Sequence, residues 1–350
     1  MNVRSPNDIE RCYGRWQEQM ADGSFRCLLC PRQCSIKVER FGFCKTRIAK
    51  KDGIYSSVYE KISSLAIDPI EKKPLYHFLP GSKILSLGTV GCNLGCQFCQ
   101  NWHISQPEHI QKVLDEKLQP LTINQLVQLA IDKSIPSVAF TYNEPITFAE
   151  FAIDAASQLK KQNIYVVAVT AGYISAAARK DFFSVFDGAN VDLKAFNDHF
   201  YQTYCKASLT PVLDTLSFIK QHTRCWLEIT NLLIPGLNDD PKEIQAMTTW
   251  IEKNLGADTP LHFSAFHPDH KLTSLPSTPI ESLLRAKDIA KECGLHYVYL
   301  GNVRSEDGSQ TFCHHCEELL VDREHYHGKS FLKGSTCPSC QQKIPGFFFY

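Results

Sequence analysis

Cysteine spacing constrains this chain of 350 residues more than any other feature of its sequence. We expect a cytoplasmic protein, because the N-terminus lacks the apolar run of a signal peptide and no stretch approaches the ~20 apolar residues of a membrane helix. Thiols stay reduced in that compartment, so clustered cysteines indicate metal ligands rather than disulfides. Of the 15 cysteines, four stand alone and should be small buried hydrophobic residues: Cys12, Cys205, Cys225 and Cys293. The others form an N-terminal group (Cys27, Cys30, Cys34 and Cys44), a central group (Cys92, Cys96 and Cys99) and a C-terminal group (Cys313, Cys316, Cys337 and Cys340).

The region between the central and C-terminal cysteines alternates short β-branched or aromatic runs with helical patterns. This alternation is typical of βαβ units around a parallel sheet, so we predict an α/β fold. Strands are expected at residues 84–89, 137–142, 164–169, 191–194, 226–233 and 261–266, with 297–300 as an extra edge strand. Apolar residues at three- and four-residue spacing predict covering helices at 123–133, 147–162, 211–222, 241–254 and 279–293. In parallel barrels the catalytic groups follow the strands, so the residues after each strand are candidates for the site.

The central cysteines follow the first expected strand, in the sequence GCNLGCQFCQNW at 91–102. Three thiols at CxxxCxxC spacing can wrap one metal centre within a short loop. A structural zinc is normally closed by four ligands, whereas a cubane cluster on three cysteines leaves one iron open for a substrate or cofactor. The alternative is a zinc loop with His103 as the fourth ligand.

This motif, with Phe98 before its last cysteine, resembles the radical S-adenosylmethionine (SAM) superfamily. The resemblance implies a partial TIM barrel, (βα)6, in which a [4Fe-4S] cluster on the central cysteines cleaves SAM reductively to a 5'-deoxyadenosyl radical. It also implies that Phe98 packs near the adenine and that His267 lies near the ribose or adenine. A lone histidine is also commonly structural.

Polar residues after two further strands match SAM contacts of the same family. Glu144 matches the acidic residue of a Gly-Gly-Glu stretch that binds the methionine ammonium, and Asp192 and Lys194 match the Asp-Leu-Lys strand end of glycyl-radical activating enzymes. The chain has Tyr142 and Asn143 where the family has two glycines. Without the resemblance, these residues would be a helix-capping glutamate and a strand-end ion pair.

The outer cysteine groups also predict metal sites. The C-terminal cysteines form two CxxC knuckles separated by 20 residues, which is typical of a structural zinc ribbon. The N-terminal cysteines have CxxCxxxCx₉C spacing, which allows either zinc or an auxiliary iron–sulfur cluster, with zinc slightly favoured.

Nearly the whole chain, from residue 27 to 346, resembles the AmmeMemoRadiSam system radical SAM enzymes, which are similar to pyruvate formate-lyase activating enzymes. The N-terminal segment Cys-Leu-Leu-Cys-Pro, the stretch beginning Leu65-Ala-Ile-Asp-Pro, the cluster loop and the double-CxxC tail carry this resemblance. We expect a Cys-rich segment and lead-in at 1–80, a barrel core at 81–302 and a zinc-ribbon-like tail at 303–350. The resemblance implies Memo-like and AMMECR-like partner proteins and a one-electron donor such as ferredoxin or flavodoxin.

The expected activity is that of a radical SAM oxidoreductase whose radical abstracts hydrogen from a protein, as in glycyl-radical activation, or from another substrate. One alternative is direct radical modification of a small molecule or a partner protein, and another is an iron–sulfur electron-transfer module that never cleaves SAM. Nucleic-acid binding is disfavoured, because 37 Lys and Arg balance 37 Asp and Glu and no aromatic-basic stripe is present. Fold resemblance does not transfer the substrate.

Overall fold

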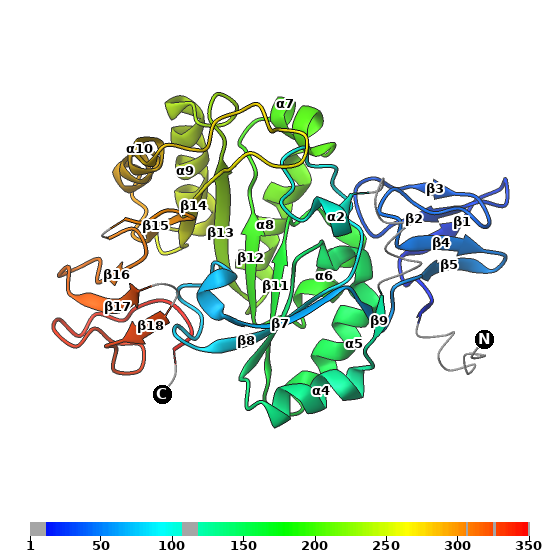
Figure 1. The fold of residues 1–350 in the computed structure, drawn as a ribbon, viewed down its shortest axis with the longest axis horizontal. Helices are drawn as coiled ribbons and strands as arrows, with labels where there is room; N and C mark the ends of the chain where they lie inside the picture. The colour runs from blue at the N-terminus through cyan, green and yellow to red at the C-terminus, as the bar shows by residue number, and fades with distance from the viewer. Residues whose placement is uncertain (1–11, 107–117, 306, 325–326, 349–350) are drawn as a thin grey trace.

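An eight-stranded β-sheet with α-helices packed against it forms the centre of the computed structural model (Figure 1). The structure describes residues 12–106, 118–305, 307–324 and 327–348. The eight strands of the central sheet lie in the order β15-β14-β13-β12-β11-β10-β8-β7. The strands from β8 to β15 are parallel, and β7 pairs with β8 in the antiparallel direction. The order ends at β7 and β15, so the sheet is an open, partial barrel. The bounds are β7 Ser64–Pro69, β8 Lys83–Gly88, β10 Ser137–Phe140, β11 Tyr165–Thr170, β12 Gly188–Asp192, β13 Trp226–Leu233, β14 Leu261–Ala265 and β15 Val298–Gly301.

The parallel strands confirm the predicted α/β fold class, and the extra edge strand expected at 297–300 is β15. Strands β8 and β10 to β14 are largely buried, as expected for a parallel sheet covered on its faces. The sequence does not predict β7, because this strand is mostly exposed and ends in Asp68 and Pro69. Since β7 precedes residue 81, the sheet extends outside the core expected at 81–302.

The helices connect successive parallel strands, and their ends follow local sequence signals. Thr122 and Gln125 form a capping box at the start of α4, and Asp240 accepts hydrogen bonds from two backbone N–H groups at the start of α9. No helix in the described part of the chain is long and apolar enough to cross a membrane. The helix bounds are α2 Trp102–Ser105, α4 Ile123–Asp132, α5 Ala149–Lys160, α6 Ala176–Phe183, α7 Asp198–Phe200, α8 Thr210–His222, α9 Pro241–Leu255 and α10 Ile280–Glu292, with short turns η1 Ile70–Lys72, η2 Pro145–Phe148 and the π-helix η3 Tyr201–Cys205.

Small antiparallel sheets lie at opposite ends of the central sheet (Figure 1). At the blue N-terminal end, Arg47 forms an ion pair with Glu150 of α5 at 2.8 Å. At the red C-terminal end, Arg323 donates a hydrogen bond to the carbonyl oxygen of Tyr76. Both cysteine-rich ends are therefore tied to the core by buried cations. The remaining strands are β1 Gln17–Gln19, β2 Phe25–Cys27, β3 Ser35–Ile36, β4 Arg47–Lys50, β5 Gly53–Ser56, β6 Lys61–Ile62, β9 Gln119–Pro120, β16 Thr311–Phe312, β17 Leu319–Glu324 and β18 His327–Ser330.

Candidate functional site

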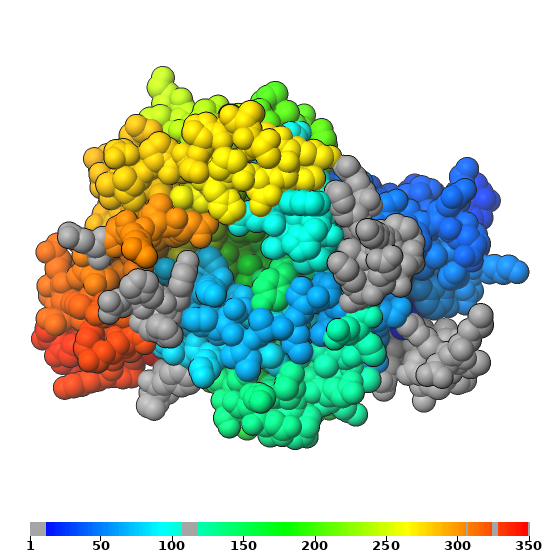
Figure 2. All heavy atoms as spheres, viewed as in Figure 1, coloured from blue at the N-terminus to red at the C-terminus, as the bar shows by residue number. Residues whose placement is uncertain are grey.

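A cavity of about 590 Å³ lies at the carboxyl ends of the parallel strands. Figure 2 shows it as a hollow in one face of the molecule, between the blue segment that begins in β7, the cyan loop after β8 and the orange end of β15. Residues at or near the ends of β10 to β14 line the remaining walls. The cavity therefore occupies the edge at which a parallel barrel gathers residues from distant parts of the sequence.

The central cysteines lie in the loop after β8 and all three line this cavity. Backbone hydrogen bonds hold the loop, because Gly91 donates to Ile104 and Gly95 donates to Cys205, each at 2.8 Å. Gly91 has a φ of +89°, and a Cβ there would collide with the carbonyl oxygen of Cys44. Only glycine fits this position, so the loop presents its three thiols from a fixed backbone.

The central cysteines suit a multi-iron cluster better than a single metal ion. A tetrahedral zinc with Zn–S bonds of ~2.3 Å holds its thiolates about 3.8 Å apart. Among these three sulfurs, which all belong to the described residues, at least one pair is more than 4.8 Å apart. His103, the alternative zinc ligand, is exposed and does not line the cavity. Burial raises the pKa of Cys99 to about 11, so this thiol stays protonated at neutral pH unless a cation binds it.

Glu144 presents a buried carboxylate to the cavity and is 3% exposed. Its Oε1 accepts hydrogen bonds from Thr170 Oγ1 at 2.6 Å and from the Ile146 N–H at 3.1 Å, and its Oε2 accepts from the Ala171 N–H at 2.8 Å. Glu144 therefore caps the turn η2, which is the capping role expected of this glutamate without the family resemblance. Its carboxylate nevertheless lies in the cavity wall. Burial raises its pKa to about 7, so small changes in its surroundings decide whether it carries charge.

Asp192 and Lys194 lie at the end of β12 and line the same cavity. Lys194 Nζ donates a hydrogen bond to Asp192 Oδ2 at 2.8 Å, so the expected strand-end ion pair is present. Burial opposes the charge on Lys194, but Asp192 and the nearby Cys96 together raise its pKa above the ordinary value. The pair therefore places a fixed ammonium group beside the central cysteines.

The structure separates the two residues expected near an adenine. Phe98 is buried in the cavity wall, with its ring centroid 5.7 Å from that of Phe200. His267 is exposed and does not line the cavity. The adjacent Phe266 is 1% exposed, and its N–H donates to Thr278 Oγ1 at 2.8 Å, which turns this side chain inward and leaves His267 in solvent. His267 thus lies outside the site that the other candidates form.

Tyr142 and Asn143, which stand where the resemblance would place two glycines, connect the cavity walls. Tyr142 adopts a φ of +69°, the left-handed conformation that favours glycine, and its hydroxyl donates to Asp68 Oδ2 at 2.9 Å. Asn143 accepts a hydrogen bond from the Thr89 N–H at 3.0 Å and donates to the Gly91 carbonyl at 2.8 Å. These side chains therefore tie the loop after β10 to the cluster loop, a role that residue type alone does not reveal.

Comparisons with known proteins relate this chain to a superfamily. Residues 86–247 match the sequence profile of the Radical SAM superfamily, and the chain is 40% identical over 332 residues to the uncharacterized protein MJ0808 of Methanocaldococcus jannaschii, covering 93% of this chain and 97% of that protein. The chain belongs to the radical SAM superfamily. It is also 24% identical over 229 residues to "Putative glycyl-radical enzyme activating enzyme MJ1632" of the same organism, covering 63% of this chain and 79% of that protein. Among solved structures, a radical SAM methyltransferase from Sphaerobacter thermophilus is 15% identical with a TM-score of 0.49, over 69% of this chain and 71% of that one.

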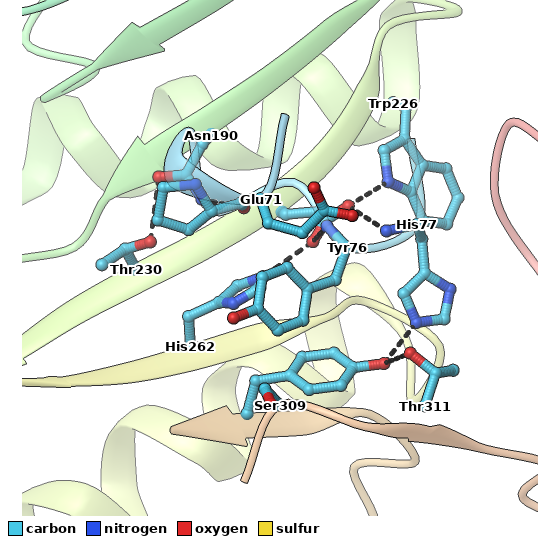
Figure 3. A network of polar contacts seen from close by, with 12 residues as sticks. Glu71, Tyr76, His77, Asn190, Trp226, Thr230, His262, Ser309 and Thr311 are labelled. Carbon is cyan, nitrogen blue, oxygen red and sulfur yellow. Dashed lines mark hydrogen bonds and ion pairs between the residues drawn. The ribbon is translucent and has the colours of Figure 1, made fainter. Parts of the chain in front are cut away.

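A buried polar network that the sequence does not predict includes residues of the cavity wall; Figure 3 shows the network. Glu228 is fully buried and accepts hydrogen bonds from the N–H groups of Tyr76 and His77, from Trp226 Nε1 and from His262 Nε2, at 2.7 to 3.0 Å. Burial opposes its ionisation, but His262 and the other donors outweigh burial and lower the pKa of Glu228. A carboxylate with four donors therefore fixes the cavity residues Tyr76 and His262 in position.

The two outer cysteine groups of this radical SAM protein differ in geometry. In the C-terminal group, Cys313 and Cys340 lie 3.6 Å apart and Cys316 and Cys337 lie 3.7 Å apart, as a single tetrahedral zinc requires. The four sulfurs all lie within 4.8 Å of one another, which is consistent with the expected zinc ribbon. The N-terminal cysteines instead line a separate cavity together with Arg47.

Proposed function

We propose that this chain is a radical SAM enzyme that holds a [4Fe-4S] cluster on the central cysteines and binds SAM in the adjoining cavity. The observation that carries the proposal is the placement of three thiols in the wall of a cavity whose other walls hold Glu144, Asp192 and Lys194. Three protein thiolates leave one iron of such a cluster without a protein ligand. When bound, the cluster and SAM together supply reductive cleavage of the sulfonium to a 5'-deoxyadenosyl radical, which abstracts hydrogen from the substrate.

The chain's own residues orient SAM and shield it. Glu144 would accept a charged hydrogen bond from the methionine ammonium, an interaction of about 1.5–3 kcal/mol. Lys194, held by Asp192, would pair as a point charge with the carboxylate. Phe98 provides an apolar wall, and the buried network around Glu228 helps to exclude water from the floor.

A cavity of this kind argues against the alternative of an electron-transfer module. Electron transfer alone needs no polar cavity of about 590 Å³ beside the metal site. It also gives no reason to bury Glu144 with a pKa raised by burial to about 7, since such perturbed groups gather at sites of binding and catalysis.

For the substrate, we propose hydrogen abstraction from a protein, as in glycyl-radical activation, or from another substrate. The alternative is direct radical modification of a small molecule or of a partner protein. The name of the relative MJ1632 supports an activating-enzyme-like reaction. We also propose that the chain is an AmmeMemoRadiSam system enzyme, with Memo-like and AMMECR-like partners and a ferredoxin or flavodoxin donor. The same proposal includes a cytoplasmic location and zinc in the C-terminal group.

The direct test is SAM cleavage. The protein is reconstituted anaerobically with iron and sulfide, reduced with dithionite and incubated with SAM, and 5'-deoxyadenosine is measured by chromatography. We expect product from the wild type and from a Cys225→Ala control, which alters a lone buried cysteine outside the cavity. Cys96→Ala should form none. Equal amounts from the wild type and Cys96→Ala would refute the proposed activity.

A further inference from the structure

The N-terminal cysteines surround a second cavity, beside the cluster loop and separate from the SAM cavity. All four thiols line it, together with the apolar side chains of Leu29, Ile36 and Phe43. Its volume is about 20 Å³, more than the roughly 10–15 Å³ that one water molecule requires. The four thiols therefore face a common space that is larger than a single atom.

The spacing of these thiols differs from that of a zinc site. In the C-terminal group of the same chain, paired sulfurs lie 3.6 and 3.7 Å apart, as one tetrahedral ion requires. Among the described residues, no three of the N-terminal sulfurs lie within 4.8 Å of one another. A cubane cluster binds each thiolate through a different iron, so it needs its four ligands farther apart than one ion does.

Arg47 supplies a second observation that points to a bound group. Its guanidinium is 2% exposed and lines the same cavity. Nη1 pairs with Glu150 at 2.8 Å, but Nε and Nη2 have no hydrogen-bond partner in the described structure. Unsatisfied buried donors are costly, and an anionic cluster with sulfide and thiolate acceptors would satisfy them.

The N-terminal site directly contacts the cluster loop. The carbonyl oxygen of Cys44 packs against Gly91, the residue before the first central cysteine, so closely that a Cβ would not fit. Asn93, which follows that cysteine, lines the N-terminal cavity, and its carbonyl accepts a hydrogen bond from Arg32 Nε. Thr46 Oγ1 lies 3.2 Å from Cys44 Sγ and 3.1 Å from the carbonyl oxygen of Thr147, so its hydroxyl lies beside this thiol. The backbones of the two cysteine-bearing segments therefore lie in direct contact.

We propose that Cys27, Cys30, Cys34 and Cys44 hold an iron–sulfur cluster rather than zinc, and that this cluster passes electrons to the central one. One electron from a donor protein of the ferredoxin or flavodoxin class reduces the N-terminal cluster from the 2+ to the 1+ state. The N-terminal cluster returns to 2+ when that electron moves to the central site. The electron-transfer step rests on the proposed function, whereas the identity of the metal does not.

Metal analysis tests the identity without any assay of SAM cleavage. The triple variant Cys92→Ala/Cys96→Ala/Cys99→Ala is reconstituted anaerobically beside the wild type, and iron, sulfide and zinc are measured per chain. We expect a fall from about eight to about four irons, with matching sulfide, because each [4Fe-4S] cluster holds four. A triple variant that contains no iron and extra zinc would refute the proposal of an iron–sulfur cluster at the N-terminal site.

Two further variants keep this test decisive if the triple variant does not fold. Cys27→Ser/Cys30→Ser should lose about half of the wild-type iron and keep its zinc. The matched control Cys313→Ser/Cys316→Ser should lose zinc and keep its iron. If Cys27→Ser/Cys30→Ser loses zinc and keeps all of its iron, the N-terminal site is a zinc site and the proposal is wrong.

The choice of electron donor tests the transfer step. In Cys27→Ser/Cys30→Ser, 5'-deoxyadenosine formation driven by reduced flavodoxin should lose most of its rate, while formation driven by dithionite, a small reductant, should stay near the wild-type rate. Equal retention of both rates, or equal loss of both, would contradict the transfer of electrons through this site.

Discussion

Acidification should destabilise this protein through His77, which is buried between the barrel and the C-terminal tail. His77 is 0% exposed. Its Nδ1 lies 2.7 Å from the carbonyl oxygen of Pro345, and its Nε2 lies 2.7 Å from the hydroxyl of Tyr299. Because a carbonyl can only accept, Nδ1 carries a proton, and burial, which disfavours a second proton on the ring, leaves Nε2 to accept from Tyr299. The native structure therefore contains the neutral imidazole.

The size of the effect follows from the pKa of this group. Burial lowers the pKa of His77 to about 4, from 6.5 for an ordinary histidine. As pH falls below 6.5 the unfolded chain takes up a proton that the folded chain refuses, so the free energy of unfolding decreases until pH approaches 4. At about 1.4 kcal/mol per pH unit, the loss between pH 7 and pH 5 is about 2 kcal/mol.

The assay is urea denaturation at pH 7 and pH 5 of the wild type and His77→Gln, whose amide does not titrate. The variant should be less stable at pH 7, since Gln cannot reproduce both hydrogen bonds. Its free energy of unfolding should nevertheless fall by about 2 kcal/mol less than that of the wild type between the two pH values. Identical pH dependence in the two proteins would refute the assignment of a buried neutral histidine.

Three further predictions concern the other sites. Glu144→Gln should weaken SAM binding by about 10- to 100-fold in equilibrium dialysis, and unchanged affinity would exclude Glu144 from the SAM site. In the wild type, SAM affinity should fall below pH 7, because a carboxyl with a pKa of about 7 becomes protonated there, and Glu144→Gln should abolish this pH dependence. Glu150→Leu removes the carboxylate that pairs with the buried Arg47 and should lower the free energy of unfolding by about 3–5 kcal/mol in urea denaturation, whereas a change within experimental error would contradict the ion pair. Cys337→Ser/Cys340→Ser should lose zinc in metal analysis and make the C-terminal tail sensitive to protease, and retention of zinc would count against the ribbon.

Local sequence patterns predict the parts of this molecule that depend on short-range signals. The strand β13 has the bounds expected from its apolar run, and α4 begins where Thr122 and Gln125 cap it. The CxxxCxxC spacing places the central cysteines in one cavity wall because all three lie in a single short loop. Glu144 and Lys194 reach the same wall because each follows a parallel strand.

The remaining features depend on contacts between residues far apart in the sequence. Cys205 was expected to be a lone buried residue, but its carbonyl oxygen accepts a hydrogen bond from Gly95 of the cluster loop at 2.8 Å, because the π-helix η3 carries it beside that loop. Glu228 and His262 are 34 residues apart and meet only when β13 and β14 pair. His267 carries a matching motif but faces solvent, since the turn after β14 buries Phe266 instead. Residue type and spacing alone cannot settle such placements.

The central claim is that the central cysteines hold a cluster with one iron open to SAM. Electron paramagnetic resonance of the dithionite-reduced protein, recorded with and without SAM, tests this directly. To isolate the central site, the spectra are recorded on Cys27→Ser/Cys30→Ser as well as on the wild type. SAM should change the g values of a [4Fe-4S]⁺ signal in both proteins, because its methionine groups become ligands of the open iron. A reduced cluster signal that is identical with and without SAM would contradict the account.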